Sequence, residues 1–538
     1  MKTNSAATQV ATGKSATGLS RLLALRNGVE VVSEENGVKL VGATEVVRTT
    51  QAGTALRTVL RALAAGPVAI SELTDTLRTR EGKGDDSQND EIRFASLLRR
   101  HAHLFAWSVT CDAAPLVMVE PISRWSRFDL LLPDDTFPLR LSRFAYARRQ
   151  GNELVVESPL SLFRVRLQSP LAREVLSALG QVTSVARLAA GQETGPGLEA
   201  VRMVVGHLVA AKVVDVGTKS GAEGAGGEVC EHEARFVEDR DDVLRQWSFH
   251  DLLFHARSRF GRHDEPFGAT FPFTGDIEHE PPVKQRPVGP TTPLYRPDLD
   301  EILAHDPRFT AVLESRRSIR AYDEQPMTAR QLGEFLYRVQ RVRAIFGPDA
   351  LSGVPYQGVD RPYPTGGATG DLDAYVTVNR CADLPRGVYY YDSAAHQLVL
   401  INKEEKALQT MLGMAYRACG GAVVPDVLLT ITARFQRMAW KYSGIAYAST
   451  LKHVGVLYQT LYLVATAMQL APCGLGSGDI QTSANIFGLD WRRESSVGEF
   501  MLGSRPAEYG PRGARHVGLA GWQHMNDPQW AIEALRYV

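Results

Sequence analysis

Lys441 and Tyr442 are the adjacent pair of side chains best suited to move a proton. An amine or a phenol with a lowered pKa can act as a general base when it lies beside a reacting group. The pair follows Trp440 and precedes a long, weakly polar stretch that is typical of a buried helix. A lone Lys-Tyr pair is more often a surface feature. Tyr447 and His453 are alternative proton carriers, although structural roles are the simpler expectation for both.

A glycine-rich turn follows the long stretch and consists of Leu475, Gly476, Ser477 and Gly478. Glycines let backbone N–H groups approach a flat redox ring, and such an N–H can donate to a ring nitrogen that accepts hydride. The plainer interpretation is a helix C-cap at Gly474 with a loop after it, and both can hold together. The spacing is not a dinucleotide-binding fingerprint, because we expect no helix to open on it and no acidic residue to follow a strand–helix unit.

Three arginines surround one serine in the run Arg316, Arg317, Ser318 and Arg320. Guanidinium groups donate bidentate hydrogen bonds, so this run suits a phosphate dianion. A solvated basic turn explains the run equally well, and the residues alone leave the two alternatives open.

A second tight loop, Pro364, Thr365, Gly366 and Gly367, precedes an expected strand. Proline and glycine in this order are typical of a turn, and on its own the loop indicates nothing more.

Composition places the chain among globular proteins with two to four domains, because 538 residues exceed a single core. The 60 basic residues balance the 60 acidic ones, so neither nucleic acid nor a membrane is an expected partner. Five scattered cysteines and an isolated His250/His255 pair predict reduced thiols in the cytoplasm and no metal site. Val454–Leu470 is shorter than the roughly 20 apolar residues of a spanning helix, so we expect it to be buried in a core or dimer interface.

Two N-terminal segments share the order strand, helix, helix, helix, strand, which suggests winged helices. Neither has a strongly basic third helix, so we expect peptide or protein binding rather than DNA binding. A proline-rich arm, Glu280–Asp300, precedes a half in which helices and strands alternate, as in an α+β sandwich. The predicted organisation is a disordered N-terminus at 1–35, winged-helix-like domains at 36–125 and 126–216, a linker and extended arm at 217–305, and a cofactor domain at 306–538.

Taken in order, these motifs resemble the SagB/ThcOx-type FMN-dependent dehydrogenases of the nitroreductase superfamily, which are azoline oxidases. The resemblance is clearest over residues 247–505 and implies an α/β sandwich of nitroreductase type. It implies that FMN is held by Arg316, Arg317, Ser318, Arg320, Pro364, Thr365, Gly366, Gly367, Leu475, Gly476, Ser477 and Gly478. It also implies that Lys441 and Tyr442 are catalytic. Thr365 stands where the family has serine and keeps the hydroxyl.

The implied activity is oxidation of thiazolines or oxazolines to azoles in a ribosomally synthesised, post-translationally modified peptide. The implied partners are the leader and azoline-containing core of a precursor peptide, a second copy of the chain, and a cyclodehydratase. Three alternatives stay open: an NAD(P)H-dependent nitro- or quinone reductase, another two-electron oxidation in natural-product biosynthesis, and a flavin-free scaffold that binds peptide or partner enzymes.

Overall fold

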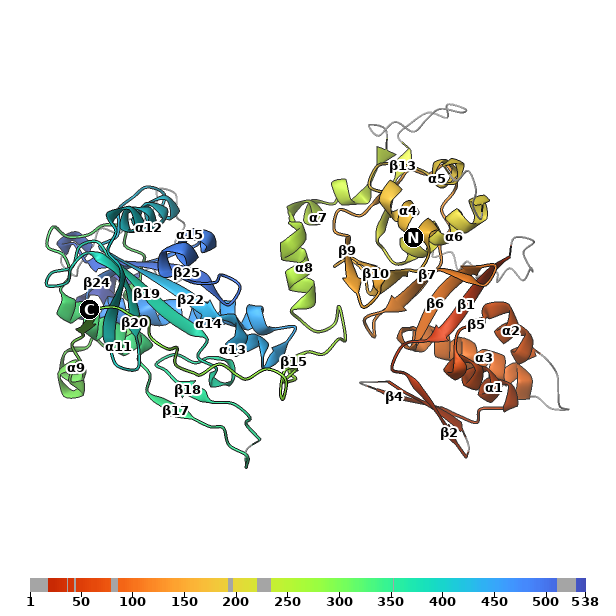
Figure 1. Cartoon of the computed structure of the whole chain (residues 1–538), viewed down its shortest axis with the longest axis horizontal. Coiled ribbons are helices and arrows are strands. Elements are labelled where there is room, and N and C mark those ends of the chain that lie inside the picture. The colour runs from red at the N-terminus through yellow and green to blue at the C-terminus, as the bar shows by residue number, and fades with distance from the viewer. Residues whose placement is uncertain are drawn as a thin grey trace. The chain divides into compact units, whose positions relative to one another are not determined.

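The protein forms two compact units, Met1–Glu265 and Pro266–Val538 (Figure 1). In this computed structural model the described residues are 18–35, 37–42, 45–78, 86–191, 197–219, 234–351, 353–509 and 529–538. Each unit has its own antiparallel sheet and its own hydrophobic clusters.

The first unit is built on one seven-stranded sheet to which both N-terminal segments contribute. Its strands, in spatial order, are β5 (Val68–Ala69), β1 (Leu19–Leu25), β6 (Phe105–Cys111), β7 (Ala114–Pro121), β11 (Phe163–Leu167), β10 (Glu153–Glu157) and β9 (Tyr146–Gln150). The junction between the segments is the β7–β11 pair, in which Val119 lies opposite Val165. One continuous sheet contains strands from both predicted winged-helix-like domains. Their division into two separate domains therefore stays a prediction.

Two sets of three helices provide separate clusters of buried side chains for the first unit. The first set is α1 (Thr54–Ala65), α2 (Ile70–Arg78) and α3 (Asp86–Arg100), and the second is α4 (Pro170–Ala178), α5 (Val185–Ala190) and α6 (Gly197–Ala210). Helix α4 begins as its sequence indicates, with Pro170 at its first position and the Ser169 hydroxyl accepting from the Ala172 N–H at 3.0 Å.

The prediction of disorder over residues 1–35 is wrong for the described part of that range. Strand β1 pairs with β6, with Leu22 opposite Ser108, and Leu23 is buried. The composition of this segment is rich in Ser, Thr and Ala and does not indicate a strand. Strand β1 forms because it pairs with β6, which is distant in sequence. Residues 1–17 lie outside the described residues.

Smaller elements complete the first unit. They are β2 (Glu30–Glu34), β3 (Gly37–Val41) and β4 (Val46–Thr50) in a three-stranded sheet, the pairs β8 (Leu139–Leu141) with β12 (Val214–Val216) and β13 (Thr218–Lys219) with β14 (Ala234–Arg235), and helices α7 (Asp242–Gln246) and α8 (Phe249–Arg257).

His207 makes the stability of the first unit depend on pH. Its imidazole is 2% exposed in the core, and Nδ1 donates to the Met203 carbonyl at 2.7 Å. Burial lowers its pKa from 6.5 to about 4, so the unfolded chain binds a proton between these values that the folded chain does not. We therefore expect stability to fall as the pH falls through this window, by about 2 kcal/mol at pH 5 from this group at roughly 1.4 kcal/mol per unit. Urea titrations at pH 7 and pH 5 measure the loss.

The matched control for this prediction is His207→Gln, whose amide stays neutral at both pH values and can still donate to Met203. It should lose less stability than the wild type between pH 7 and pH 5, because all other histidines are shared. Equal losses in the two proteins would contradict the role of His207.

The second unit is a three-layer sandwich around a seven-stranded antiparallel sheet (Figure 1). Its strands, in order, are β16 (Thr291–Pro293), β21 (Gln397–Asn402), β20 (Gly387–Asp392), β19 (Leu372–Val378), β22 (Val427–Arg434), β25 (Glu494–Ser504) and β24 (Leu470–Leu475). Strand β22 is apolar on both faces, because Leu429 and Ile431 enter one cluster and Leu428 enters the other. This confirms the predicted α+β sandwich.

Helices α11 (Ala329–Gln340) and α14 (Ala446–Ala467) cover one face, and α12 (Glu405–Ala418) and α15 (Ile480–Phe487) cover the other. The predicted burial of α14 is only half correct. Leu457 and Leu461 are buried, whereas Leu451 and Val456 are each 38% exposed on the opposite side. Within the described part of the chain, no helix is both long and apolar enough to span a bilayer.

The second unit begins before the predicted boundary at residue 306, because the preceding segment pairs with it. Strand β15 (Gly268–Ala269) pairs with β23 (Tyr442–Ser443), and β16 in the extended arm pairs with β21. The other elements of the unit are β17 (Ala344–Phe346), β18 (Gly358–Asp360), α9 (Leu299–His305), α10 (Phe309–Ser315), α13 (Phe435–Ala439) and α16 (Gln529–Ala534).

Candidate active site

Lys441 lies just after helix α13 and is only 7% exposed. Its Nζ donates to the hydroxyl of Tyr356, and that hydroxyl donates to the Gly367 carbonyl at 2.8 Å. The amine also lies 5.0 Å from the ring centroid of Tyr442. The hydrogen-bond partner of Lys441 is therefore Tyr356, which the sequence did not single out.

The loop at Gly366 and Gly367 packs directly on Lys441. Gly367 has φ +62°, and a Cβ there would lie 2.0 Å from Lys441 Nζ and 2.9 Å from the Tyr442 hydroxyl. Only glycine fits such a position without displacing the amine. Thr365 stabilises the turn, because its hydroxyl accepts from the Gly370 N–H at 3.1 Å. The structure thus brings the predicted loop and the predicted base together.

His453 holds this loop in place. The Gly366 N–H donates to Nε2 at 2.7 Å, so the ring proton lies on Nδ1, which donates to Asp371 at 2.8 Å. Thr450 donates to the second oxygen of Asp371 at 2.8 Å. The Nε2 lone pair already accepts a hydrogen bond, so His453 positions the loop rather than acting as the base. The other alternative, Tyr447, is 48% exposed and packs edge-on against Phe435.

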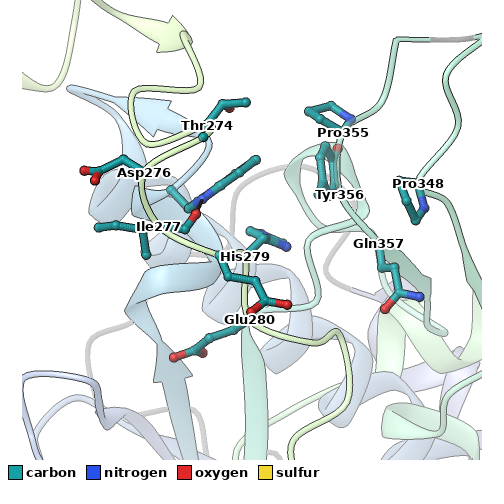
Figure 2. Close-up of a pocket in the computed structure, with 12 residues that line it drawn as sticks. Thr274, Asp276, Ile277, His279, Glu280, Pro348, Pro355, Tyr356 and Gln357 are labelled. Atoms are coloured by element: carbon teal, nitrogen blue, oxygen red, sulfur yellow. Dashed lines mark hydrogen bonds between the residues drawn. The ribbon is translucent and has the colours of Figure 1, made fainter.

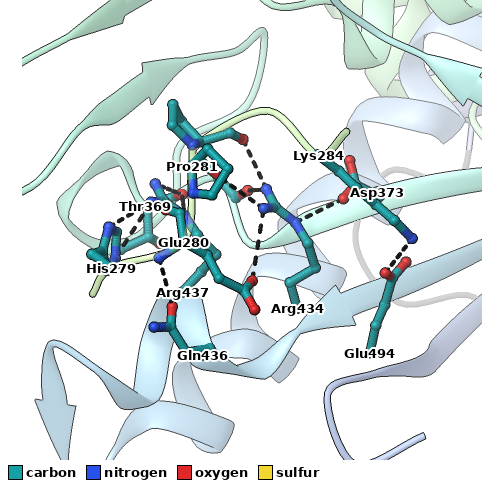
Figure 3. Close-up of polar contacts among 12 residues, drawn as sticks. His279, Glu280, Pro281, Lys284, Thr369, Asp373, Arg434, Gln436, Arg437 and Glu494 are labelled. Atoms are coloured by element: carbon teal, nitrogen blue, oxygen red, sulfur yellow. Dashed lines mark hydrogen bonds and ion pairs between the residues drawn. The ribbon is translucent and has the colours of Figure 1, made fainter. Parts of the chain in front are cut away.

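Arg437 connects three segments that are distant in sequence (Figure 3). Its guanidinium is 0% exposed and donates to the carbonyls of Gln357 at 2.9 Å and Thr369 at 2.8 Å. It also donates to the Glu280 carbonyl at 2.5 Å and to His279 Nδ1 at 2.7 Å. Burial lowers the pKa of Arg437 to about 9, and no carboxylate is among its hydrogen-bond acceptors in the described chain.

Arg434 fixes the arm that precedes β16 (Figure 3). It donates to the carbonyls of Pro281 and Pro282 at 2.7 and 2.8 Å and pairs with Asp373 at 2.9 Å. Nearby, Lys284 pairs with Glu494. The arm lies along the sheet because the buried Arg434 guanidinium binds its carbonyls and because Lys284, within the arm, pairs with Glu494 of β25.

The arginine run lies beside Tyr462 of α14. Ser318 shares a 2.7 Å hydrogen bond with the Tyr462 hydroxyl, which also accepts from the Gly474 N–H at 2.7 Å. The Arg316 guanidinium lies 5.1 Å from the ring centroid of Tyr462. Arg320 is exposed. The run and the end of β24 are therefore joined through one phenol.

Arg505 joins the arginine run and was missed at the sequence level. Its Nη2 is buried and has no hydrogen-bond partner among the described residues. Burial, together with the smaller effect of the Arg317 charge, lowers the pKa of Arg505 to about 10. Arg317 donates to the Tyr509 carbonyl at 2.5 Å. A partly desolvated pair of guanidiniums is suited to an anion. Arg505 directly follows the buried strand β25, and its proximity to Arg317 could not be read from the sequence.

The glycine-rich turn leaves space on its outer side. Gly476, Ser477 and Gly478 are exposed, and a Cβ on Gly476 would meet nothing within 4 Å. A Cβ on Gly478 would lie 2.2 Å from the carboxylate of Glu499. The expectation that no helix opens on this turn is wrong, because α15 begins at Ile480 with Asp479 as its N-cap. Leu475 itself is buried at the end of β24.

Most of the predicted residues fall into two groups that contact different parts of α14. The Lys441 cluster, defined as Lys441, Tyr442, Tyr356, Gly366, Gly367 and His453, lies near the start of α14. The arginine cluster, defined as Arg316, Arg317, Ser318 and Arg505, lies near Tyr462. His453 and Tyr462 are about 13 Å apart along the helix axis at 1.5 Å per residue.

One group of possible metal ligands belongs to the first unit. Glu45, His101 and His103 have ligand atoms within 4.8 Å of one another, and His103 contacts the Glu45 carboxylate. The expectation of no metal stays a prediction.

Comparison with known proteins places the second unit in a family. The model described as "Nitroreductase family" matches residues 313–504. "Putative nitroreductase MJ1384" of Methanocaldococcus jannaschii is 30% identical over 190 residues, which are 35% of this chain and 86% of that protein. The chain belongs to the nitroreductase family. A model described as "Cyanobactin oxidase ThcOx" matches residues 139–264, so this nitroreductase is of the SagB/ThcOx type and is an oxidoreductase.

Solved structures similar to this chain include the following two. One is the Escherichia coli microcin synthetase McbBCD complex with truncated pro-MccB17 bound, with 19% identity and a TM-score of 0.29 over 44% of this chain and 82% of that chain. The other is a "putative nitroreductase in complex with fmn" from Desulfovibrio desulfuricans, with 17% identity and a TM-score of 0.25 over 40% and 97%.

Proposed function

We propose that this nitroreductase is an FMN-dependent dehydrogenase that oxidises azolines to azoles in a ribosomally synthesised, post-translationally modified peptide. The observation that carries this proposal is the Lys441 cluster, in which a buried amine is held between two phenols and a glycine loop. A reductase of nitro groups or quinones does not require such a base. The ThcOx match over residues 139–264 favours a peptide substrate.

The residues present fit FMN. Arg505 Nη2, which has no hydrogen-bond partner in the described part of the chain, and the nearby Arg317 offer a desolvated cationic site for a phosphate. Gly476 keeps backbone accessible to a flat ring, because a Cβ there would meet nothing within 4 Å. Bound FMN would supply the two-electron acceptor of the reaction.

Azoline oxidation removes a proton from one ring carbon and a hydride from its neighbour. Lys441 would take the proton, because its buried amine lies against the glycine loop. The Tyr356 hydroxyl accepts from Nζ and donates to the Gly367 carbonyl, so it keeps the amine oriented. Tyr442 lies against the same loop and could stabilise the developing charge.

A homodimer explains why the two clusters are apart on α14. We propose that the Lys441 cluster of one chain faces the arginine cluster of the other across this helix. The exposed apolar side chains Leu451 and Val456 support burial of the outer face of α14. We also propose that the first unit binds the precursor peptide, that a cyclodehydratase supplies the azoline, and that the reaction takes place in the cytoplasm.

The proposed function is tested by flavin content and by anaerobic reduction of the purified protein. We expect a yellow protein that releases one FMN per chain and is bleached by an azoline peptide. Bleaching by NADPH alone would favour the nitro- or quinone reductase. A colourless protein that cannot be reconstituted with FMN would favour the scaffold.

Arg505→Met should weaken FMN retention without unfolding the protein. Hydrogen bonds to charged groups are worth about 1.5–3 kcal/mol, so the dissociation constant should rise by about 10- to 150-fold. Equilibrium dialysis of reconstituted protein measures it. Arg417→Met, on an exposed residue of α12, is the matched control. Equal FMN retention in the two variants would show that Arg505 does not bind the cofactor.

A further inference from the structure

A cavity adjoins the Lys441 cluster within the second unit. It has a volume of about 520 Å³, which is in the range of ligand pockets. Residues 274–280 form one wall and residues 355–357 form the other, with Pro348 and Trp440 completing it. Figure 2 shows His279 between the wall that carries Asp276 and the wall that carries Tyr356.

The side chain of Tyr356 connects this cavity to the predicted base, Lys441. Tyr356 lines the cavity, and its hydroxyl accepts from Lys441 Nζ. On the other wall, Trp440 donates to the Ile277 carbonyl at 2.6 Å, and the Phe271 N–H donates to the Lys441 carbonyl at 3.1 Å. A molecule bound here would contact the same phenol that orients the amine.

The interior of the cavity is aromatic and uncharged at neutral pH. The His279 ring lies 4.7 Å from Trp440 and 5.3 Å from Tyr356 between centroids. Burial lowers the pKa of His279 to about 4, so the ring is neutral. Arg437 lies behind it, and its donors are occupied by backbone carbonyls and His279. Such an interior suits an uncharged segment that can stack on aromatic rings.

The rim of the cavity carries negative charge. Asp276, Glu278 and Glu280 line it, and no lysine or arginine is among the described lining residues. Glu280 lies 3.9 Å from Arg434, which offsets its charge, whereas Asp276 and Glu278 are exposed. A like charge approaching this rim is repelled, so acidic ligands are disfavoured.

We propose that this cavity is a substrate subsite that takes the uncharged peptide segment next to the reacting ring and selects against acidic side chains in that segment. The inference rests on the proposed function for the identity of the ligand as an azoline peptide. Beyond the proposed function, it assigns a binding site to the residues that flank the ring and states that uncharged residues bind there better than acidic ones.

Equilibrium binding of fluorescently labelled azoline peptides to the full chain tests the subsite without requiring turnover. The peptides carry a ring alone, a ring flanked by two alanines, or a ring flanked by two aspartates. We expect the alanine peptide to bind at least about tenfold more tightly than the ring alone, and the aspartate peptide to lose that gain. Adding salt should reduce the difference between the two flanked peptides.

Asp276→Asn combined with Glu278→Gln should raise affinity for the aspartate peptide to within about twofold of the alanine peptide. Glu324→Gln, an exposed acidic residue that is not among those lining the cavity, is the control and should leave the preference unchanged. The proposal is overturned if flanking alanines add no affinity, or if the aspartate peptide binds wild-type protein as well as the alanine peptide. If this binding pattern holds while no azoline reduces the flavin, the proposed reaction fails and the subsite stands.

Discussion

Lys441→Ala is expected to slow azoline-dependent flavin reduction by about 10²–10⁴-fold, the usual cost of removing a positioned general base. FMN should stay bound, because Lys441 does not belong to the arginine cluster that is proposed to hold the phosphate. Anaerobic stopped-flow measurement of flavin bleaching isolates this step from reoxidation by oxygen. The FMN content of the variant should equal that of the wild type.

Variants of the two tyrosines next to Lys441 test whether the lysine acts alone or together with a phenol. Tyr442→Phe and Tyr356→Phe each remove one hydroxyl and keep the ring. If Lys441 and Tyr442 act as one unit, their double variant should be no slower than Lys441→Ala alone. A hydrogen bond from Nζ to Tyr356 predicts the same non-additivity for that pair. Wild-type bleaching in Lys441→Ala/Tyr442→Phe would show that both residues are structural.

Arg437→Leu should lower the free energy of unfolding of the second unit by at least about 3 kcal/mol. The substitution leaves the carbonyls of Gln357, Thr369 and Glu280 without their donor, at about 1–3 kcal/mol for each group that stays buried. The same loss frees the segments that carry Tyr356 and Gly367, so bleaching by azoline should fall as well. Urea denaturation followed by fluorescence measures the first effect.

Arg417→Leu is the control, since an exposed arginine usually changes stability by no more than about 0.5 kcal/mol. Arg437→Lys should fall between the two, because an ammonium group supplies donors without the planar geometry of the guanidinium. Stability of Arg437→Leu equal to that of Arg417→Leu would show that water replaces the guanidinium at no cost.

The parts of the fold that depend on local pattern could be predicted from the sequence. The helix start at Ser169-Pro170 and the β10–β11 hairpin follow from capping and alternation, and both are present. The glycine loop and Lys441 could be named from their types, and the structure places them in contact.

The residues that complete the site could not be predicted, because their roles arise from contacts distant in sequence. Tyr356 meets Lys441 across 85 positions, and Asp371 meets His453 across 82. Neither Tyr356 nor Asp371 stands in a pattern that differs from an ordinary loop or strand. The burial of Arg437 likewise depends on the arm at Glu280, which local periodicity cannot place.

The β7–β11 junction in the first unit limits how this protein can be shortened. A fragment that ends between residues 121 and 163 would retain β7 and lose β11, so the N–H and C=O groups of the Val117–Pro121 edge would face solvent. Unpaired edges of this kind recruit other chains, and such a fragment is expected to aggregate during expression. A soluble N-terminal fragment should therefore extend to Glu265, where the unit ends.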